Sequence, residues 1–181
     1  MVGNLPNLLT LTRILLLPFF AATLIYKEYN YALMIFAAAS ITDYFDGLVA
    51  RLRNQVTYFG TILDPVADKF FLFTSFILMT TNGLIPKWIT VIVISKDLIV
   101  ITGSIIVYFV TDQLKVESNF LGKVSSASQF ILIGIILLLL NINDGVSAPM
   151  FLFVIVAVLT SVSGLQYVYI GLKAASNENT P

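Results

Sequence analysis

The chain has 181 residues, of which 58% are hydrophobic and 11% are charged, and its formal net charge is zero. This apolar share exceeds what a soluble domain of the same size can bury, so part of it must face lipid. Because the chain contains no cysteine and no histidine, disulfides, zinc sites of the usual kind, thiol or imidazole nucleophiles and Ser-His-Asp arrangements are excluded.

Six apolar stretches come close to the roughly 20 residues that a membrane-spanning helix needs. In chain order they are residues 8–25, 31–49, 62–80, 86–110, 124–141 and 149–172. Charges or turn residues separate them, as at Lys27-Glu28 and Asn82-Gly83. The sequence predicts an all-α, polytopic membrane protein with six transmembrane helices in one bundle. Residues 1–175 are predicted to form one domain, and residues 176–181 a disordered tail.

The distribution of basic residues predicts that both termini lie in the cytoplasm. In this orientation, six basic residues lie at or near the cytoplasmic ends of helices: Arg13, Arg51, Arg53, Lys115, Lys123 and Lys173. Only Lys27 and Lys87 then lie outside. The first stretch has no basic residue before Arg13 and is long enough to span, so it is predicted to be a retained helix and not a cleaved signal peptide. The compact chain without a targeting segment suggests a bacterial inner membrane protein.

Four carboxylates cluster where the second and third predicted helices meet. Asp43 and Asp46 are three residues apart, and Asp64 and Asp68 are four apart, so each pair lies on one helical face. Charged residues within a membrane normally face the protein interior or a water-filled cavity. A short loop makes the two helices antiparallel neighbours, and the repulsion among four carboxylates then calls for bound cations. Oxygen-only ligands indicate Mg²⁺ or Mn²⁺.

Small residues lie beside these carboxylates, and two interpretations of them remain open. Gly47, Ala50, Gly60 and Ala67 can leave room for a ligand next to the metals, or they can let two helices approach closely. Pro65 also leaves two local geometries open. Either the third helix begins there with Asp64 as its N-cap, or it begins nearer Gly60 and is kinked.

The spacing of these residues resembles the signature of the CDP-alcohol phosphatidyltransferases, D-x2-D-G-x2-A-R-x8-G-x3-D-x3-D. Every specified position is matched, by Asp43, Asp46, Gly47, Ala50, Arg51, Gly60, Asp64 and Asp68. The six-helix layout extends the resemblance over nearly the whole chain. The resemblance implies a membrane enzyme that moves a phosphatidyl group from CDP-diacylglycerol to an alcohol in phospholipid synthesis.

The resemblance also implies roles for individual residues. Two divalent metals are expected on Asp43, Asp46 and Asp64 with help from Asp68, and Asp68, together with Asp64, is expected to be catalytic, with Asp68 as the general base. The residues expected around the CDP group are Gly47, Ala50, Arg51 and Gly60. A homodimer whose active sites open toward the cytoplasm is implied, and no nucleic acid is expected as a partner. Direct attack by the acceptor hydroxyl is preferred, while a covalent intermediate remains open.

The acceptor is predicted from the amino-terminal run N-L-P-N-L-L-T-L-T-R, residues 4–13. This run is similar to the opening of the phosphatidylglycerophosphate synthase and cardiolipin synthase branches, both of which use a glycerol hydroxyl. Arg13, Lys96 and Lys123 are the candidate ligands of an acceptor phosphate, although each could instead be a helix-end or snorkelling residue.

The glycerol 3-phosphate branch often has basic residues at the positions that Ser104 and Ser125 occupy here, so this chain lacks two expected cations. The surrounding residues are Lys96-Asp97 and a G-K-V-S-S run at residues 122–126. The prediction is glycerol 3-phosphate, and the alternative is phosphatidylglycerol, whose diester phosphate carries less charge. A more distant alternative is an ion-coupled transporter, but its acids should spread over several helices.

Overall fold

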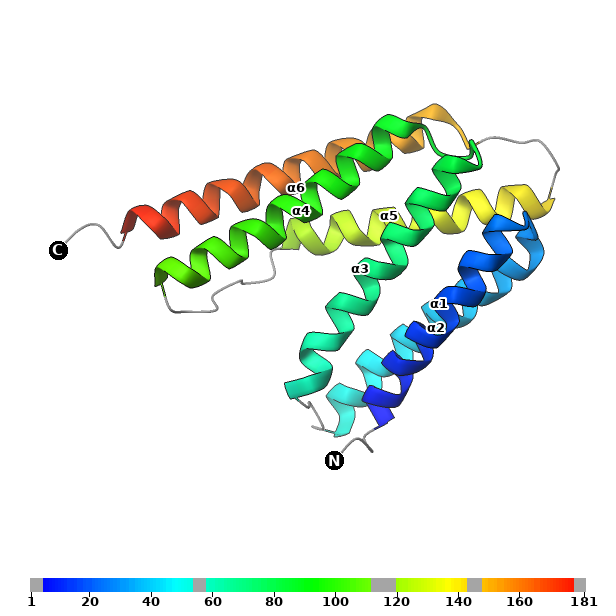
Figure 1. Cartoon of the computed structure of the whole chain (residues 1–181), viewed down its shortest axis with the longest axis horizontal. Coiled ribbons are helices and arrows are strands. Elements are labelled where there is room, and N and C mark those ends of the chain that lie inside the picture. The colour runs from blue at the N-terminus through cyan, green and yellow to red at the C-terminus, as the bar shows by residue number, and fades with distance from the viewer. Residues whose placement is uncertain (1–4, 54–57, 112–119, 143–147, 178–181) are drawn as a thin grey trace. The chain divides into compact units, whose positions relative to one another are not determined.

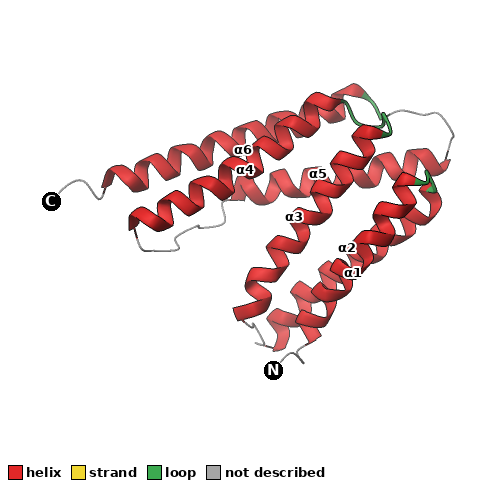
Figure 2. Cartoon of the chain, in the orientation of Figure 1, coloured by secondary structure: helices red, strands yellow, loops and turns green. Residues whose placement is uncertain are grey.

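The computed structural model describes the backbone of residues 5–53, 58–111, 120–142 and 148–177. Side chains are described for residues 12–42, 67–103, 120–142 and 148–171. The described backbone contains six α-helices and no strand, which confirms the all-α prediction (Figure 1, Figure 2). The helices are α1 Leu5–Ile25, α2 Tyr29–Arg53, α3 Tyr58–Thr81, α4 Lys87–Thr111, α5 Phe120–Ile142 and α6 Met150–Asn177.

The chain divides into two compact units. Unit 1 comprises Met1–Leu84 and Ile133–Ala148, and unit 2 comprises Ile85–Leu132 and Pro149–Pro181. Helix α1 packs against α2 and α3 in unit 1, and α4 packs against α6 in unit 2. The single domain over residues 1–175 stays a prediction. Of the predicted tail, residues 176–177 belong to α6, and residues 178–181 lie outside the described part of the chain.

An aromatic cluster forms the centre of unit 1. The rings of Phe20 on α1 and Phe71 on α3 are stacked with centroids 4.7 Å apart, and Phe36 on α2 lies about 6 Å from both (6.4 and 6.0 Å). All three side chains are buried. A Cβ added to Gly134 on α5 would lie 3.2 Å from the Phe36 ring. The absence of a side chain there lets the carboxyl half of α5 approach this cluster.

Two similar turns end α1 and α3. Lys27 and Gly83 have positive φ values of 61° and 76°. The next amide in each turn donates back five residues, from Glu28 to the Thr23 carbonyl at 2.8 Å and from Leu84 to the Met79 carbonyl at 2.9 Å. These are Schellman motifs, which satisfy the last carbonyls of a helix. In unit 1, the Asn82 side-chain amide also donates to the Leu24 carbonyl at 2.7 Å, which ties the ends of α1 and α3 together.

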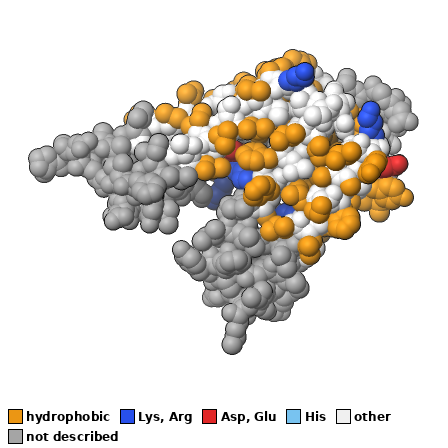
Figure 3. Space-filling view, in the orientation of Figure 1, with side chains coloured by type: hydrophobic (Ala, Val, Ile, Leu, Met, Phe, Trp, Pro, Cys, Tyr) orange, Lys and Arg blue, Asp and Glu red, His pale blue; other side chains and the backbone are white. Residues whose placement is uncertain are grey.

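Many large apolar side chains are exposed along the helices. Figure 3 shows hydrophobic side chains spread over the described part of the visible face, with few charged groups among them. Such a surface suits contact with lipid or with another protein. Among the described residues, two helical segments are long and apolar enough to cross a membrane, Phe120–Ile142 and Met150–Gly171. Shorter apolar segments occupy Thr12–Ile25 and Tyr29–Thr42, so six transmembrane helices remain a prediction.

Candidate active site and its neighbouring polar residues

The eight residues of the spaced pattern lie on two consecutive helices. Residues 43–51 belong to α2 and residues 60–68 to α3, both of which lie in unit 1. The side chains of seven of these residues lie outside the described part of the chain: Asp43, Asp46, Gly47, Ala50, Arg51, Gly60 and Asp64. Among the side chains that are described, no group of three or more His, Cys, Asp or Glu residues could hold a metal. The metal site and the CDP contacts therefore stay predictions.

The start of α3 settles the question about Pro65. Helix α3 begins at Tyr58, so Pro65 lies inside the helix. The alternative in which the helix starts at Pro65 with Asp64 as its N-cap is wrong. Asp64 and Asp68 consequently lie on one continuous helix, at the four-residue spacing that puts them on one face.

Asp68 forms an ion pair with Arg13 in unit 1. Arg13 Nη1 on α1 donates to Asp68 Oδ1 on α3, across 55 positions of sequence. The Arg13 side chain is almost fully buried, with 3% exposed, whereas 35% of the Asp68 side chain remains exposed. The pair therefore joins a buried guanidinium to an aspartate side chain that is partly exposed.

Packing between α1 and α3 brings this pair together. Phe20 and Leu24 follow Arg13 along the α1 sequence and are buried, and Phe71 and Leu72 follow Asp68 by three and four residues and are also buried. The stacked Phe20 and Phe71 rings join the two helices. The aliphatic stem of an arginine can be buried among such apolar neighbours while its guanidinium meets a carboxylate.

The arrangement gives Asp68 a defined chemical capacity. A charge-assisted bond from a buried guanidinium restricts the orientation of the carboxylate. The pair was not predicted from the sequence, in which Arg13 is a candidate ligand of the acceptor phosphate. That role stays a prediction, and the contact with Asp68 gives Arg13 a second role.

A second ion pair is buried in unit 2, between adjacent residues of α4. Lys96 Nζ lies 2.7 Å from Asp97 Oδ1, and the side chains are 5% and 1% exposed. Successive residues of a helix point in different directions, so the lysine stem has to bend to reach its neighbour. A Cβ added to Gly164 on α6 would lie 3.1 Å from Lys96 Cγ, so the glycine makes room for this stem. The positive charge of Lys96 is thus matched locally by Asp97.

Lys123, the third predicted acceptor ligand, has a different environment. It lies near the start of α5 and is exposed. Within the described part of the chain, no carboxylate lies within ion-pair distance of its ammonium. The preceding Gly122 faces Tyr167 on α6, where an added Cβ would lie 2.7 Å from the Tyr167 hydroxyl. This environment is compatible with an anion-binding role for Lys123 and also with an ordinary helix-end lysine.

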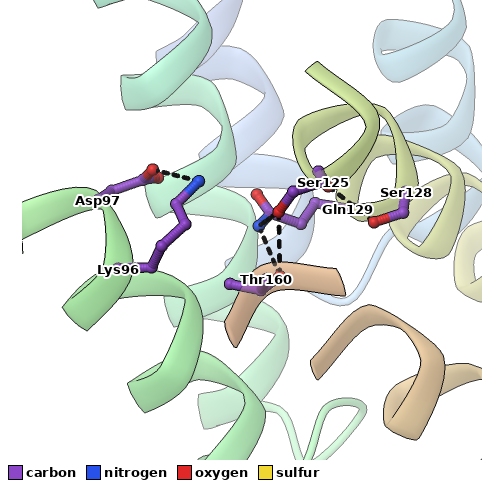
Figure 4. A network of polar contacts seen from close by, with 6 residues as sticks. All are labelled: Lys96, Asp97, Ser125, Ser128, Gln129 and Thr160. Atoms are coloured by element: carbon purple, nitrogen blue, oxygen red, sulfur yellow. Dashed lines mark hydrogen bonds and ion pairs between the residues drawn. The ribbon is translucent and has the colours of Figure 1, made fainter. Parts of the chain in front are cut away.

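A cluster of uncharged polar groups lies in unit 2, on the facing sides of α5 and α6 (Figure 4). Gln129 Nε2 donates to Thr160 Oγ1 at 3.1 Å and to Ser125 Oγ at 3.4 Å, and Ser125 Oγ donates to Thr160 Oγ1 at 3.2 Å. All three side chains are fully buried. This cluster was not predicted from the sequence, because its residues are uncharged and come from two separate apolar stretches. Polar residues inside predicted spans were the available signal.

Comparisons with known proteins identify what the chain resembles. Residues 3–165 match the family model described as CDP-alcohol phosphatidyltransferase. A protein of Mycobacterium tuberculosis (strain H37Rv) named "Probable phosphatidylglycerophosphate synthase" is 32% identical over 95% of this chain and 83% of its own length. A Salmonella typhimurium protein named "CDP-diacylglycerol--glycerol-3-phosphate 3-phosphatidyltransferase" is 36% identical over 91% of this chain and 92% of its own. The human "Cardiolipin synthase (CMP-forming)" is 31% identical over 94% of this chain and 62% of its own.

Proposed function

The chain belongs to the CDP-alcohol phosphatidyltransferase family, and from this membership we propose that it transfers a phosphatidyl group from CDP-diacylglycerol to a hydroxyl of a glycerol-containing acceptor, releasing CMP. The observation that carries the proposal is the complete eight-residue pattern on α2 and α3. Relatives with names of this reaction class align with more than nine-tenths of the chain, 91% to 95%. The transporter alternative has no comparable support, because these relatives are named as enzymes.

The four carboxylates Asp43, Asp46, Asp64 and Asp68 are proposed to hold two divalent metal ions. This donor set fits Mg²⁺ or Mn²⁺, which prefer oxygen ligands. The partial exposure of Asp68 is consistent with this proposal, since 35% of its side chain is exposed. Such ions, when bound, neutralise a pyrophosphate and stabilise the leaving group. The proposed contacts of the CDP group are Gly47, Ala50, Arg51 and Gly60.

Asp68 is proposed as the general base, with Asp64 as the second catalytic carboxylate. Asp68 accepts the proton of the acceptor hydroxyl, and the hydroxyl oxygen forms a bond to the phosphorus of the phosphatidyl group. The bond from that phosphorus to CMP breaks, and CMP leaves with the electron pair. General-base catalysis requires a base with a fixed position, and the ion pair with Arg13 supports this requirement. Direct transfer is preferred to a covalent intermediate, because outside the metal-binding carboxylates no activated nucleophile is recognised in the sequence.

Replacing Arg13 by glutamine should lower kcat by about tenfold to 10²-fold, because Asp68 loses the group that orients it. Arg13→Lys should restore part of this loss, since lysine keeps the charge and lacks the planar fork of donors. Steady-state kinetics in lipid nanodiscs measure kcat and the KM for the acceptor. Lys27→Gln is the control, because Lys27 is an exposed cation in the turn after α1. An unchanged kcat with a raised KM for the acceptor would instead support the acceptor-phosphate role of Arg13.

Glycerol 3-phosphate is proposed as the acceptor, in agreement with the names of the Mycobacterium and Salmonella relatives. Phosphatidylglycerol is the second candidate, and one observation favours it. The charge of Lys96 is matched by Asp97, so this lysine attracts a phosphate monoester less strongly than a lysine without a carboxylate partner would. A diester phosphate demands less positive charge from its site. Arg13, Lys96 and Lys123 remain the proposed phosphate ligands in both cases.

A lipid substrate fits a protein within the membrane. We propose that all six helices span the bilayer, because α5 and α6 are long and apolar enough to do so and the basic residues favour cytoplasmic termini. The acyl chains of CDP-diacylglycerol can then remain in lipid while its headgroup reaches the carboxylates. A bacterial inner membrane location, a cytoplasm-facing site and a homodimer belong to the same proposal.

A chromatographic assay tests the function and the acceptor together. Purified protein is given labelled CDP-diacylglycerol and Mg²⁺ or Mn²⁺, with glycerol 3-phosphate or phosphatidylglycerol offered separately. Phosphatidylglycerophosphate is the expected product. Cardiolipin as the product would establish the second candidate. If neither acceptor gives product or CMP under any metal condition, the transferase function is refuted.

A further inference from the structure

Arg13 places a buried positive charge against one of the four proposed metal ligands. The Arg13 side chain is 3% exposed, and its Nη1 donates to Oδ1 of Asp68, whose side chain is 35% exposed. Both residues belong to unit 1, so the contact lies within one compact part of the chain. The guanidinium therefore contacts the same carboxylate that is proposed to bind a metal ion.

Helix α1 packs against both helices that carry the proposed ligands. Its neighbours in unit 1 are α2 and α3, and the four carboxylates lie on these two helices. Phe20 and Leu24 of α1 are buried, and the Phe20 ring stacks on Phe71 of α3. The charge of Arg13 is therefore held inside unit 1 by the packing of the helix that carries it.

A buried cation weakens the binding of a second cation to the same carboxylate. Like charges repel each other, and the repulsion is strongest where water and salt screen it least. The Arg13 side chain is almost fully buried, so its charge is poorly screened. A carboxylate can accept more than one partner, so Asp68 can contact the arginine and a metal ion together. Its affinity for the metal is then lower than it would be without the arginine.

Helix packing alone does not account for an arginine at this position. An apolar side chain would join α1 to α3 without the cost of burying a charge. The Asp68 side chain is 35% exposed, so it is not a fully buried acid that requires a counter-charge inside the fold. The charge of Arg13 is therefore better explained by the chemistry of the carboxylates than by the stability of unit 1.

The charge balance of the metal-loaded carboxylates gives this arginine a use. Two divalent cations carry the same total charge as four carboxylates, so these groups alone would be neutral together. Arg13 adds one positive charge to them. The pyrophosphate of the proposed donor is an anion, and an excess of positive charge attracts and stabilises it.

We propose that Arg13 lowers the affinity of the four carboxylates for divalent cations, an inference that rests on the metal site proposed above. The same charge leaves the metal-loaded site with a positive excess for the anionic donor. Arg13 is thus a positioning residue for Asp68 that also sets the concentration of Mg²⁺ or Mn²⁺ that the enzyme requires.

Titration with Mn²⁺ alone tests the proposal without turnover. The full chain is placed in nanodiscs of phosphatidylcholine, which has no net charge, and Mn²⁺ binding is measured by electron paramagnetic resonance. Arg13→Gln should lower the Mn²⁺ concentration at half-saturation by about three- to tenfold, because a repelling charge is removed. Arg13→Lys should stay within about twofold of the wild type, since lysine keeps the charge. Lys27→Gln removes an exposed cation in the turn after α1 and should leave the value unchanged.

Turnover gives a second readout that separates this role from the alternatives. In Arg13→Gln the Mg²⁺ concentration for half-maximal CMP release should fall, although kcat falls as well because Asp68 is less well oriented. A variant with damaged packing would instead require more metal. Loss of an acceptor-phosphate ligand would leave Mn²⁺ binding in the absence of substrates unchanged.

The outcomes distinguish failure of this inference from failure of the metal site. A folded Arg13→Gln variant that binds Mn²⁺ like the wild type, or more weakly, overturns the inference and leaves the metal site intact. Arg13→Lys binding as tightly as Arg13→Gln also overturns it, since the charge would then have no effect. If Arg13→Gln does not fold, Arg13→Met decides, because methionine adapts to apolar surroundings, and the same decrease is expected. A wild type without saturable Mn²⁺ binding refutes the metal site itself.

Discussion

Replacing Asp68 by asparagine should lower kcat for CMP release by about 10²- to 10⁴-fold, the usual contribution of a positioned general base. Asparagine keeps the size of the side chain and cannot accept the proton of the acceptor hydroxyl. Asparagine also weakens a proposed metal ligand, and saturating Mg²⁺ compensates for that effect, so the part of the loss that persists at saturating Mg²⁺ reports the missing base. Release of labelled CMP from CDP-diacylglycerol at saturating acceptor measures the effect.

A double variant separates catalysis from stability in this experiment. In Asp68→Asn the buried Arg13 guanidinium loses the carboxylate that it contacts, which should lower the thermal unfolding midpoint. Arg13→Gln combined with Asp68→Asn removes both charges, so it should regain stability without regaining activity. If the double variant recovers kcat, the loss in the single variant came from the unpaired arginine, and Asp68 is not the base.

Removal of divalent cations should abolish CMP release, with a loss of about 10³-fold or more, because Lewis-acid stabilisation contributes several kcal/mol. The four carboxylates are the groups expected to hold these ions, and bound cations offset their mutual repulsion. Activity should return on addition of Mg²⁺ or Mn²⁺ to the chelated protein. Full activity in the presence of a strong chelator would contradict a metal-dependent transfer.

Single carboxylate variants test which residues hold the ions. Asp43→Asn, Asp46→Asn and Asp64→Asn should each raise the Mn²⁺ concentration at half-saturation by about tenfold, since each removes one anionic ligand. Electron paramagnetic resonance measures Mn²⁺ binding without reliance on turnover. Glu28→Gln, at an exposed acid in the turn after α1, is the control. Unchanged Mn²⁺ binding in all three aspartate variants would exclude them as ligands.

The sequence predicted the helices well because their signal is local. Each predicted apolar stretch corresponds to one observed helix. The fourth and sixth stretches begin one residue before their helices, at Pro86 and Pro149, and the other four begin two to four residues after the helix starts. The observed helices extend further at polar ends, as at Arg53 of α2 and Asn177 of α6. An apolar window stops where the chain becomes polar, whereas backbone hydrogen bonds continue the helix past that point.

The tertiary structure changed the interpretation of the candidate site at two cations. Arg13 was assigned from sequence to an acceptor phosphate, but packing of α1 on α3 brings it to Asp68. Lys96 was assigned the same role, and its charge is matched by Asp97 within α4. Neither partner could be chosen from the sequence, since the contacts of a long flexible side chain depend on which helices surround it.

The sequence by itself determined the all-helical class, the family and the set of four carboxylates, because hydrophobic stretches and residue spacing are properties of the linear chain. Only the tertiary structure decided which cation holds Asp68 and which polar groups share the interior of unit 2. Gln129 and Thr160 are 31 positions apart, and Arg13 and Asp68 are 55 apart. Such pairs form when helix packing brings residues that are distant in the sequence into contact, a condition that local sequence patterns do not encode.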